Sequence, residues 1–176
     1  MELIGILCWF VELGRINIMV DVSMLSSYTM QPHMGHLDQA FHIFGYLKRN
    51  RRATIVFNES TVNWDEGMFE HYDWTDFYRG AKENLPLNAP PPRGNAIQIN
   101  CFIDADHAGN RVTRRSQTGI LIFINRSPIQ WYSKSQSTIE TSTFGSEFTA
   151  LQIAVEMLES LHYKITHVQS AIGWTT

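Results

Sequence analysis

The chain has little cysteine, no excess of positive charge and no long uninterrupted apolar run. Cys8 and Cys101 match no metal or redox spacing, so we expect two small buried residues in a reducing, intracellular compartment, cytoplasm or nucleus. Fourteen basic against 17 acidic residues exclude binding of nucleic acid by bulk electrostatics and leave only a local patch for it. The apolar segment 3–13 is shorter than the roughly 20 residues of a membrane span, so it predicts a buried helix and no membrane partner.

The composition is that of a folded protein, since 44% of the residues are apolar and 12% aromatic. Apolar positions recur at helical spacing over residues 3–30, with a break near Gly14, and predict two short helices. The second of these keeps Ile18, Val22 and Leu25 on one face. Another helix is predicted after Pro32, ending in a basic cluster. Its apolar face is expected to contain Leu37, Phe41, Phe44 and Leu47, and the cluster consists of Lys48, Arg49, Arg51 and Arg52.

Regular patterning is weaker in the middle of the chain. A short strand is predicted at residues 53–57, and no further periodicity is found until about residue 96. The segment 59–96 combines aromatic residues with the proline run 90–92, which is typical of a stiff linker with aromatic anchors. No basic stripe alternates with these aromatic side chains, so we expect them to pack between the two parts of the chain.

Apolar and polar residues alternate with the period of a half-buried strand from residue 97 onward. This strand runs into Asp104 and Asp106, whose carboxylates are expected on the face opposite the apolar side chains. The apolar run 119–124 and the alternation at 129–131 predict two more strands, joined by a turn at 125–128. The segment 97–132 is therefore expected to form an antiparallel meander.

A helix is predicted over residues 144–162, with Ser142 or Thr143 as its N-cap and Glu147 in its first or second turn. Its apolar stripe is expected to pack across the three strands. The stripe consists of Phe148, Leu151, Ala154 or Val155, Leu158 and Leu161.

Four sequence blocks follow one another in this second half. They are Cys101-Phe-Ile-Asp-Ala-Asp-His-Ala-Gly109, Arg114-Arg-Ser-Gln-Thr-Gly119, Pro128-Ile-Gln-Trp-Tyr-Ser-Lys134 and Glu140-Thr-Ser-Thr-Phe-Gly-Ser-Glu-Phe-Thr-Ala150. In this order they resemble the ribonuclease H (RNase H) domain of copia-type retrotransposons, and the order is far more specific than any single block. Upstream segments resemble the end of the reverse transcriptase in the same Pol polyproteins. These are residues 3–15, 23–27, Gly35-His-Leu-Asp38 and Tyr46-Leu-Lys48.

The resemblance implies an α+β chain of three segments. Residues 1–58 would be a small, mainly helical reverse transcriptase remnant, and residues 59–96 the linker. Residues 97–176 would be a truncated RNase H-like domain, made of three antiparallel strands and then a helix.

The resemblance also implies a chemistry. Such nucleases hydrolyse the RNA strand of an RNA–DNA hybrid with two Mg²⁺ ions, one activating water and the other stabilising the leaving oxygen. Matched to the family motif, Asp104 would bridge the ions and Glu147 would bind one of them, so the two are expected to face each other across a cleft. Asp106 is a further candidate metal ligand. Without the motif order, such carboxylates are more typical of a polar strand end and a solvated helix turn than of a metal site.

Several polar residues are candidates for contacts with the hybrid, the expected partner. Arg111, Arg114, Arg115 and Lys134 are candidates for phosphate, and the Ser116 and Thr118 hydroxyls for sugar or phosphate oxygens. Charge alone is equally compatible with a solvated hairpin and loop.

The family pattern is incomplete here. In the family, a later strand ending in Asp-Asn supplies a third carboxylate, whereas residues 165–176 contain no acidic residue, which we interpret as truncation or a frame change. Asp106, Glu140 and Glu156 are the nearby carboxylates in sequence that could replace it. The polymerase aspartates have no counterpart, so polymerase activity is not expected. Two functions stay open. The chain is either a weak endonuclease, which is a hydrolase, or a catalytically dead remnant that at most binds polynucleotide. We expect it to bind Mg²⁺ weakly and to cleave hybrids negligibly.

Overall fold

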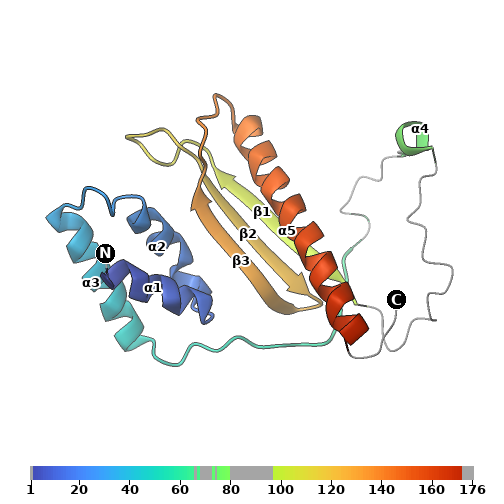
Figure 1. The fold of residues 1–176 in the computed structure, drawn as a ribbon, viewed down its shortest axis with the longest axis horizontal. Helices are drawn as coiled ribbons and strands as arrows, with labels where there is room; N and C mark the ends of the chain where they lie inside the picture. The colour runs from blue at the N-terminus through green and yellow to red at the C-terminus, as the bar shows by residue number, and fades with distance from the viewer. Residues whose placement is uncertain (1, 66, 68–72, 74, 80–96, 172–176) are drawn as a thin grey trace.

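The computed structural model describes residues 2–65, 67, 73, 75–79 and 97–171, which form a helical region beside a sheet with one long helix (Figure 1). The helical region comprises α1 (Glu2–Glu12), the 3-10 helix η1 (Ile16–Ile18), α2 (Met19–Ser26) and α3 (Met34–Arg49). The second region comprises β1 (Ile99–Asp106), β2 (Gln117–Ile124), β3 (Ser127–Ser135) and α5 (Thr143–Ala171), and the one-turn α4 (Thr75–Tyr78) lies between the two in sequence.

The break between α1 and α2 occurs at Gly14, as the sequence predicts. Gly14 has a φ of 103°, a backbone conformation that disfavours residues with a Cβ. A Cβ at this position would also lie 2.6 Å from Cδ1 of Ile55. After this turn, Ile18, Val22 and Leu25 are buried with α1 and α3, so the predicted apolar face of the second helix is confirmed.

The buried face of α3 differs from the predicted one. Ala40, Ile43 and Leu47 are buried and Phe44 packs against them, whereas Leu37 is 36% exposed and Phe41 56% exposed. The prediction is therefore confirmed for Phe44 and Leu47, whereas Ala40 and Ile43 take the places predicted for Leu37 and Phe41. The small Ala40 side chain lets α3 approach the other helices closely. A pattern based on large apolar side chains does not reveal this contact.

The strand predicted at residues 53–57 is not formed. This segment is part of a connection that runs from α3 along the sheet (Figure 1) and has no strand partner of its own. Its continuation bonds to side chains: the Asn58 N–H donates to Ser127 Oγ at 2.7 Å and the Val62 N–H to Gln98 Oε1 at 3.0 Å. The residues of this segment favour β-structure, but the segment is not hydrogen-bonded to a neighbouring strand.

In the described part of the linker, Trp64 contacts β1, and packing of the linker aromatics between the two parts of the chain stays a prediction. Trp64 donates its indole N–H to Asn100 Oδ1 at 3.1 Å and its ring lies 6.0 Å from that of Phe102. The proline run 90–92 and most of the other linker aromatics lie outside the described residues.

The three strands form an antiparallel sheet in the order β1-β2-β3, which confirms the predicted meander. The β2–β3 connection has only two residues, and Asn125 adopts a left-handed φ of 54° that suits such a tight turn. The register shifts between Ile122 and Phe123, close to Pro128 on β3. Proline has no N–H to donate, and strand irregularities and sheet edges are the places that tolerate it.

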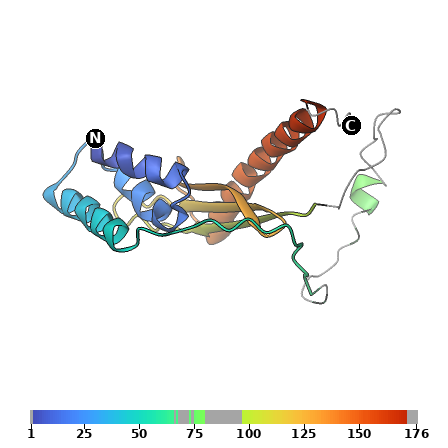
Figure 2. The same ribbon diagram turned by 90° about the horizontal axis from the view of Figure 1, so that it is seen from below.

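Helix α5 begins where the sequence predicts and extends further, to Ala171. Ser142 is its N-cap, since Ser142 Oγ accepts the N–H of Gly145 at 3.1 Å. Figures 1 and 2 show α5 beside β1 and β2, away from the α1–α3 region.

The stripe by which α5 packs on the sheet is only partly the predicted one. Ala154, Leu158 and Leu161 contact the core around Ile120 and Ile122, as expected. Three other predicted members are exposed, and the contacts are made instead by Ile153 and Met157 with the fully buried Ala150 on the same side of the helix. The small side chains of Ala150 and Ala154 bring the helix close to the sheet. The exposed members are Phe148, Leu151 and Val155.

Candidate functional site

The two aspartates of β1 lie on the face of the sheet that α5 does not cover. Cys101 and Ile103 pack into the core under α5, and strand alternation turns Asp104 and Asp106 to the other side. This confirms the predicted separation of the carboxylates from the apolar side chains. Gly119 is the cross-strand partner of Asp104, so no side chain of β2 lies directly beside that carboxylate.

Helix α2 lies across this same face and is tied to the sheet by polar contacts. Gln117 Nε2 donates to Ser23 Oγ at 2.8 Å and to Ser133 Oγ at 2.9 Å. The Trp131 indole N–H donates to the Val11 carbonyl at 3.1 Å, which attaches the end of α1 to β3. These hydrogen bonds join residues separated by 94 and 120 positions, so the helical region and the sheet region are in direct contact here.

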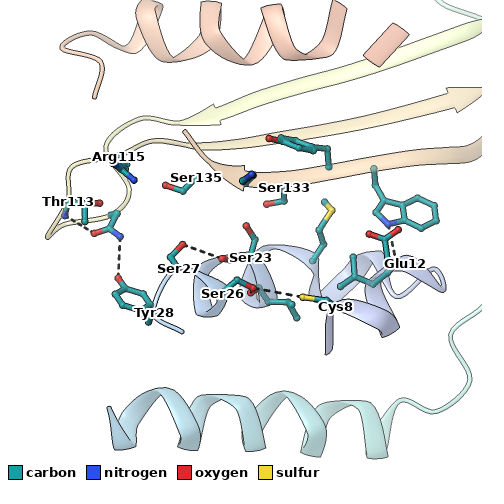
Figure 3. A pocket seen from close by; sticks show the side chains of 17 residues that line it. Cys8, Glu12, Ser23, Ser26, Ser27, Tyr28, Thr113, Arg115, Ser133 and Ser135 are labelled. Atoms are coloured by element: carbon teal, nitrogen blue, oxygen red, sulfur yellow. Dashed lines mark hydrogen bonds between the residues drawn. The ribbon is translucent and has the colours of Figure 1, made fainter. Parts of the chain in front are cut away.

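Two adjoining cavities remain at this surface. The smaller, of about 160 Å³, is lined by Asp104 and Asp106 from the sheet and by Val20 and Met24 from α2. The larger, of about 550 Å³, is rich in hydroxyl groups from α2 and β3 (Figure 3). Arg115 lines both, and its guanidinium forms no hydrogen bond or ion pair with the described residues. The two cavities share Ser27, Tyr28, Asn110, Arg115, Ser133 and Ser135.

The loop after β1 is held by Asn110, a residue that sequence reasoning missed. Asn110 Oδ1 accepts the backbone N–H groups of Val112 and Thr113, and Asn110 Nδ2 donates to the Tyr28 hydroxyl at 3.2 Å (Figure 3). The Gly-Asn pair is a turn signal that predicts the first contacts but not the distant one to α2. A Cβ at Gly109 would overlap the Asp106 carboxylate, so this loop packs directly on the site.

The predicted nucleic-acid contacts divide into exposed and buried residues. Arg111, Arg114 and Arg115 are exposed in the loop between β1 and β2, and Lys134 is exposed near the end of β3. Ser116 is fully buried and accepts the N–H of Ala108 at 3.1 Å.

Thr118 is also fully buried, and Gln136 Nε2 donates to its hydroxyl at 3.0 Å. Neither this hydroxyl nor that of Ser116 therefore reaches a sugar or phosphate at the surface, and both support the loop and the start of α5.

Glu147 is half-buried near the start of α5, which packs against the opposite face of the sheet from Asp104. The cavity beside Asp104 contains no residue of α5. Helix α5 covers the apolar face of β1, and both aspartates alternate away from that face, so the expected cleft between Asp104 and Glu147 stays a prediction.

The other carboxylates considered for the site have local partners. Glu140 Oε1 accepts the Thr138 hydroxyl at 2.9 Å, and Glu156 Oε1 accepts from Gln152 Nε2 at 3.3 Å. Across the described ranges, no group of three or more His, Cys, Asp or Glu side chains is placed to hold a metal ion.

The two cysteines are not disulfide-bonded, and they differ in environment. Cys101 is half-buried under α5, and burial raises the pKa of its thiol. Cys8 is exposed and lines the larger cavity, so the expectation that both are buried is wrong for Cys8. The neighbouring Leu7 occupies the core position of α1 instead.

None of the described helices is both long and apolar enough to cross a membrane.

Tyr132 of β3 packs in the core under α5, and burial there raises the pKa of its hydroxyl.

Comparison with known proteins gives partial matches only. No protein family model and no solved structure matches the chain. It is 27% identical to the retrovirus-related Pol polyprotein from transposon RE2 of Arabidopsis thaliana over 114 residues, which is 57% of this chain and 8% of the relative. The corresponding polyprotein from transposon RE1 is 29% identical over 59 residues, 34% of this chain and 4% of the relative.

An uncharacterized mitochondrial protein of the same plant is 33% identical over 66 residues, which is 38% of this chain and 28% of the relative. The chain therefore spans less than a third of the length of each of these relatives. At this low identity and partial coverage, the similarity supports a relation of the chain to retrotransposon Pol polyproteins.

Proposed function

We propose that the chain is a copia-type Pol fragment whose second half is an RNase H-like domain with impaired nuclease activity. One observation carries the proposal: a strand ending in Asp104 and Asp106, two antiparallel strands, and a helix with Glu147 near its start follow one another in the chain. The copia-type nuclease is expected to have this order, and the Pol polyprotein relatives support the same descent.

The residues present fit one Mg²⁺ ion better than two. Asp104 and Asp106 offer carboxylate oxygens on one face of β1, and oxygen ligands are those that Mg²⁺ prefers. Glu147 lies on a helix that packs against the other face. When bound, Mg²⁺ would supply electrostatic stabilisation of charge on a phosphate. Asp104 would hold the ion, and the nearby Arg115 would position a phosphate by charge.

Helix α2 forms one wall of the cavity beside the aspartates. This cavity has a volume of about 160 Å³ and is partly formed by Val20 and Met24, while Asp104 and Asp106 themselves are exposed. Exposed cations of the adjoining loop, such as Arg111 and Arg114, are available for phosphate contacts. The proposed domain therefore binds a hybrid at its surface, and it cleaves the hybrid negligibly because its aspartates fit one Mg²⁺ ion better than two.

A catalytically dead remnant that only binds polynucleotide is the second candidate. The packing of α5 against the face of the sheet opposite Asp104 favours it, because two-metal hydrolysis needs its ions about 3.5–4 Å apart and its carboxylate ligands close together.

Calorimetric titration with Mg²⁺, together with a cleavage assay on a labelled RNA–DNA hybrid, separates these functions. We expect weak Mg²⁺ binding that Asp104→Asn abolishes and that Asp38→Asn, an exposed carboxylate on α3, leaves unchanged. Cleavage should stay close to background in all three proteins. Efficient Mg²⁺-dependent cleavage, lost in Asp104→Asn, would contradict the impairment. Absence of any Mg²⁺ binding by the unchanged chain would favour the dead remnant.

A further inference from the structure

A second polar site lies in the helical region, where α3 ends. A shallow cavity of about 640 Å³ is lined by residues from the η1 segment and from the end of α3. Five of its lining residues are cations, and none is an aspartate or glutamate. The lining consists of Arg15, Asn17, Tyr46, Lys48, Arg49, Asn50, Arg51, Arg52 and Ala53.

Two of the cations are fixed by backbone carbonyls. Arg15 Nη1 donates to the Asn50 carbonyl at 2.9 Å, and Arg51 Nε donates to the Lys48 carbonyl at 3.0 Å. Carbonyls at a helix C-terminus carry partial negative charge, which would otherwise repel an anion. Because Arg15 and Arg51 occupy them, the remaining positive charge of the cavity is available to a ligand.

Arg15 also carries an unsatisfied donor. Its Nη2 is buried and has no hydrogen-bond partner among the described residues, although Nε donates to Asn17 Oδ1 at 3.2 Å. A buried guanidinium N–H without an acceptor costs free energy, so Arg15 is held here although one of its donors is left unpaired among the described residues. Lys48, Arg49 and Arg52 are exposed around it.

We propose that this cavity, named here the α3 basic notch, binds phosphate groups of a nucleic acid strand. Arg15 and Arg51 would provide fixed donors, and Lys48, Arg49 and Arg52 would contact neighbouring phosphates. A strand fits better than a single phosphate because five cations exceed the charge of one phosphate group. Tyr46, 42% exposed in the lining, offers an aromatic surface on which a base stacks. The net charge of −3 makes this local concentration of cations distinctive.

The α3 basic notch does not rest on the nuclease assignment, because its residues belong to α3 and to the segment before α2. Binding of a labelled single-stranded oligonucleotide, followed by fluorescence anisotropy over a range of salt concentrations, tests it. We expect Lys48→Gln/Arg49→Gln/Arg52→Gln to weaken binding about tenfold or more at low salt and to reduce the salt slope by about 2, since each lost phosphate contact on a single strand contributes about 0.7.

A matched variant removes the same charge elsewhere. Arg79→Gln/Arg126→Gln/Lys164→Gln alters exposed residues outside the notch and should change affinity by less than about twofold. Asp104→Asn should leave this binding unchanged, so loss of the proposed nuclease site and loss of the notch give different results. Arg15→Lys retains a charge but removes the planar guanidinium that the Asn50 carbonyl and Asn17 hold in place, and should weaken binding while thermal denaturation shows a folded chain.

Competition distinguishes the sources of phosphate. Excess pyrophosphate and excess polyglutamate should each displace the oligonucleotide poorly. If pyrophosphate displaces the oligonucleotide at similar concentrations, the ligand of the notch is a small phosphate compound and the proposed strand binding is wrong. Displacement by polyglutamate, or equal losses in the two triple variants, would overturn phosphate recognition at the notch.

Discussion

The helical region and the sheet region bury their apolar residues to different extents. The helices α1–α3 enclose a core of eight buried residues that lies between them. The sheet and α5 have four such residues in their main core, and apolar side chains remain exposed on both elements. Phe144 is 78% exposed and Phe148 59% exposed on α5, and Ile99 is 43% exposed on β1. The helical region also leaves apolar side chains exposed, since Trp9 is 63% and Phe41 56% exposed. The two regions therefore differ in how many residues their cores bury, and both keep exposed apolar surface.

This difference suggests that the two regions have separate stabilities. Each has its own core, and the two are joined by hydrogen bonds such as Gln117 to Ser23 and by Trp131 of β3, which packs against the helical core. Net contributions of single hydrogen bonds are about 0.5–1.5 kcal/mol, whereas a fully buried aliphatic side chain contributes more. The sheet region should consequently be the less stable of the two.

The largest effects are expected from core truncation in either region. Leu7→Ala and Ile122→Ala each remove a side chain with 0% exposure and should lower the free energy of unfolding by about 2–5 kcal/mol. Hydrogen exchange during urea titration should show Leu7→Ala destabilising α1–α3 and Ile122→Ala destabilising the sheet. Equal destabilisation of both regions by either variant would show that the chain unfolds as one unit.

A smaller effect is expected where the regions meet. Trp131→Phe removes the indole N–H that bonds to the Val11 carbonyl and should cost about 1–2 kcal/mol by thermal denaturation. Trp9→Phe, at a position 63% exposed, is the matched control and should cost little. If the two variants melt alike, the hydrogen bond does not hold the regions together.

The N-cap of α5 should contribute less again. Ser142→Ala removes the acceptor for the Gly145 N–H and should destabilise the sheet region by about 1 kcal/mol. Ser160→Ala, an exposed position within α5, should be neutral or slightly stabilising because alanine favours helix. Urea denaturation monitored by circular dichroism compares the pair, and a greater loss in Ser160→Ala would argue against the cap.

The smallest effect tests which side of α5 faces the sheet. Phe148→Ser should change the free energy of unfolding by less than about 0.5 kcal/mol, because Phe148 is largely exposed. If Phe148 were in the core, as the sequence pattern predicts, the same substitution would lower the free energy of unfolding by about 3 kcal/mol or more. Chemical denaturation of this variant therefore decides between the two faces.

Sequence periodicity predicted elements better than faces. The alternation at 97–103 and the apolar run 119–124 correctly predicted the meander, and Ser142 was a correct cap. The faces of α3 and α5 were misjudged because large apolar side chains dominate a pattern, while Ala40 and Ala154 determine how closely helices pack. Local pattern does not decide which of two overlapping apolar faces a helix buries.

The candidate site was predictable only in part for the same reason. The side of β1 that carries Asp104 and Asp106 follows from strand alternation, and this prediction is confirmed. That α2 lies over this side depends on contacts such as Gln117 to Ser23, between residues 94 positions apart. No spacing rule connects them. The roles of Asp104, Asp106 and Glu147 in metal binding stay predictions.

The long sequence separation of the contacts between the regions has a consequence for folding order. The helices α1–α3 are complete by Arg49, whereas the Trp131–Val11 contact needs a chain that extends beyond residue 131. During synthesis, the helical core can form first, and its outer surface stays uncovered until β3 emerges. Contacts of such high separation also close slowly, so docking of the two regions is expected to be the late step of folding.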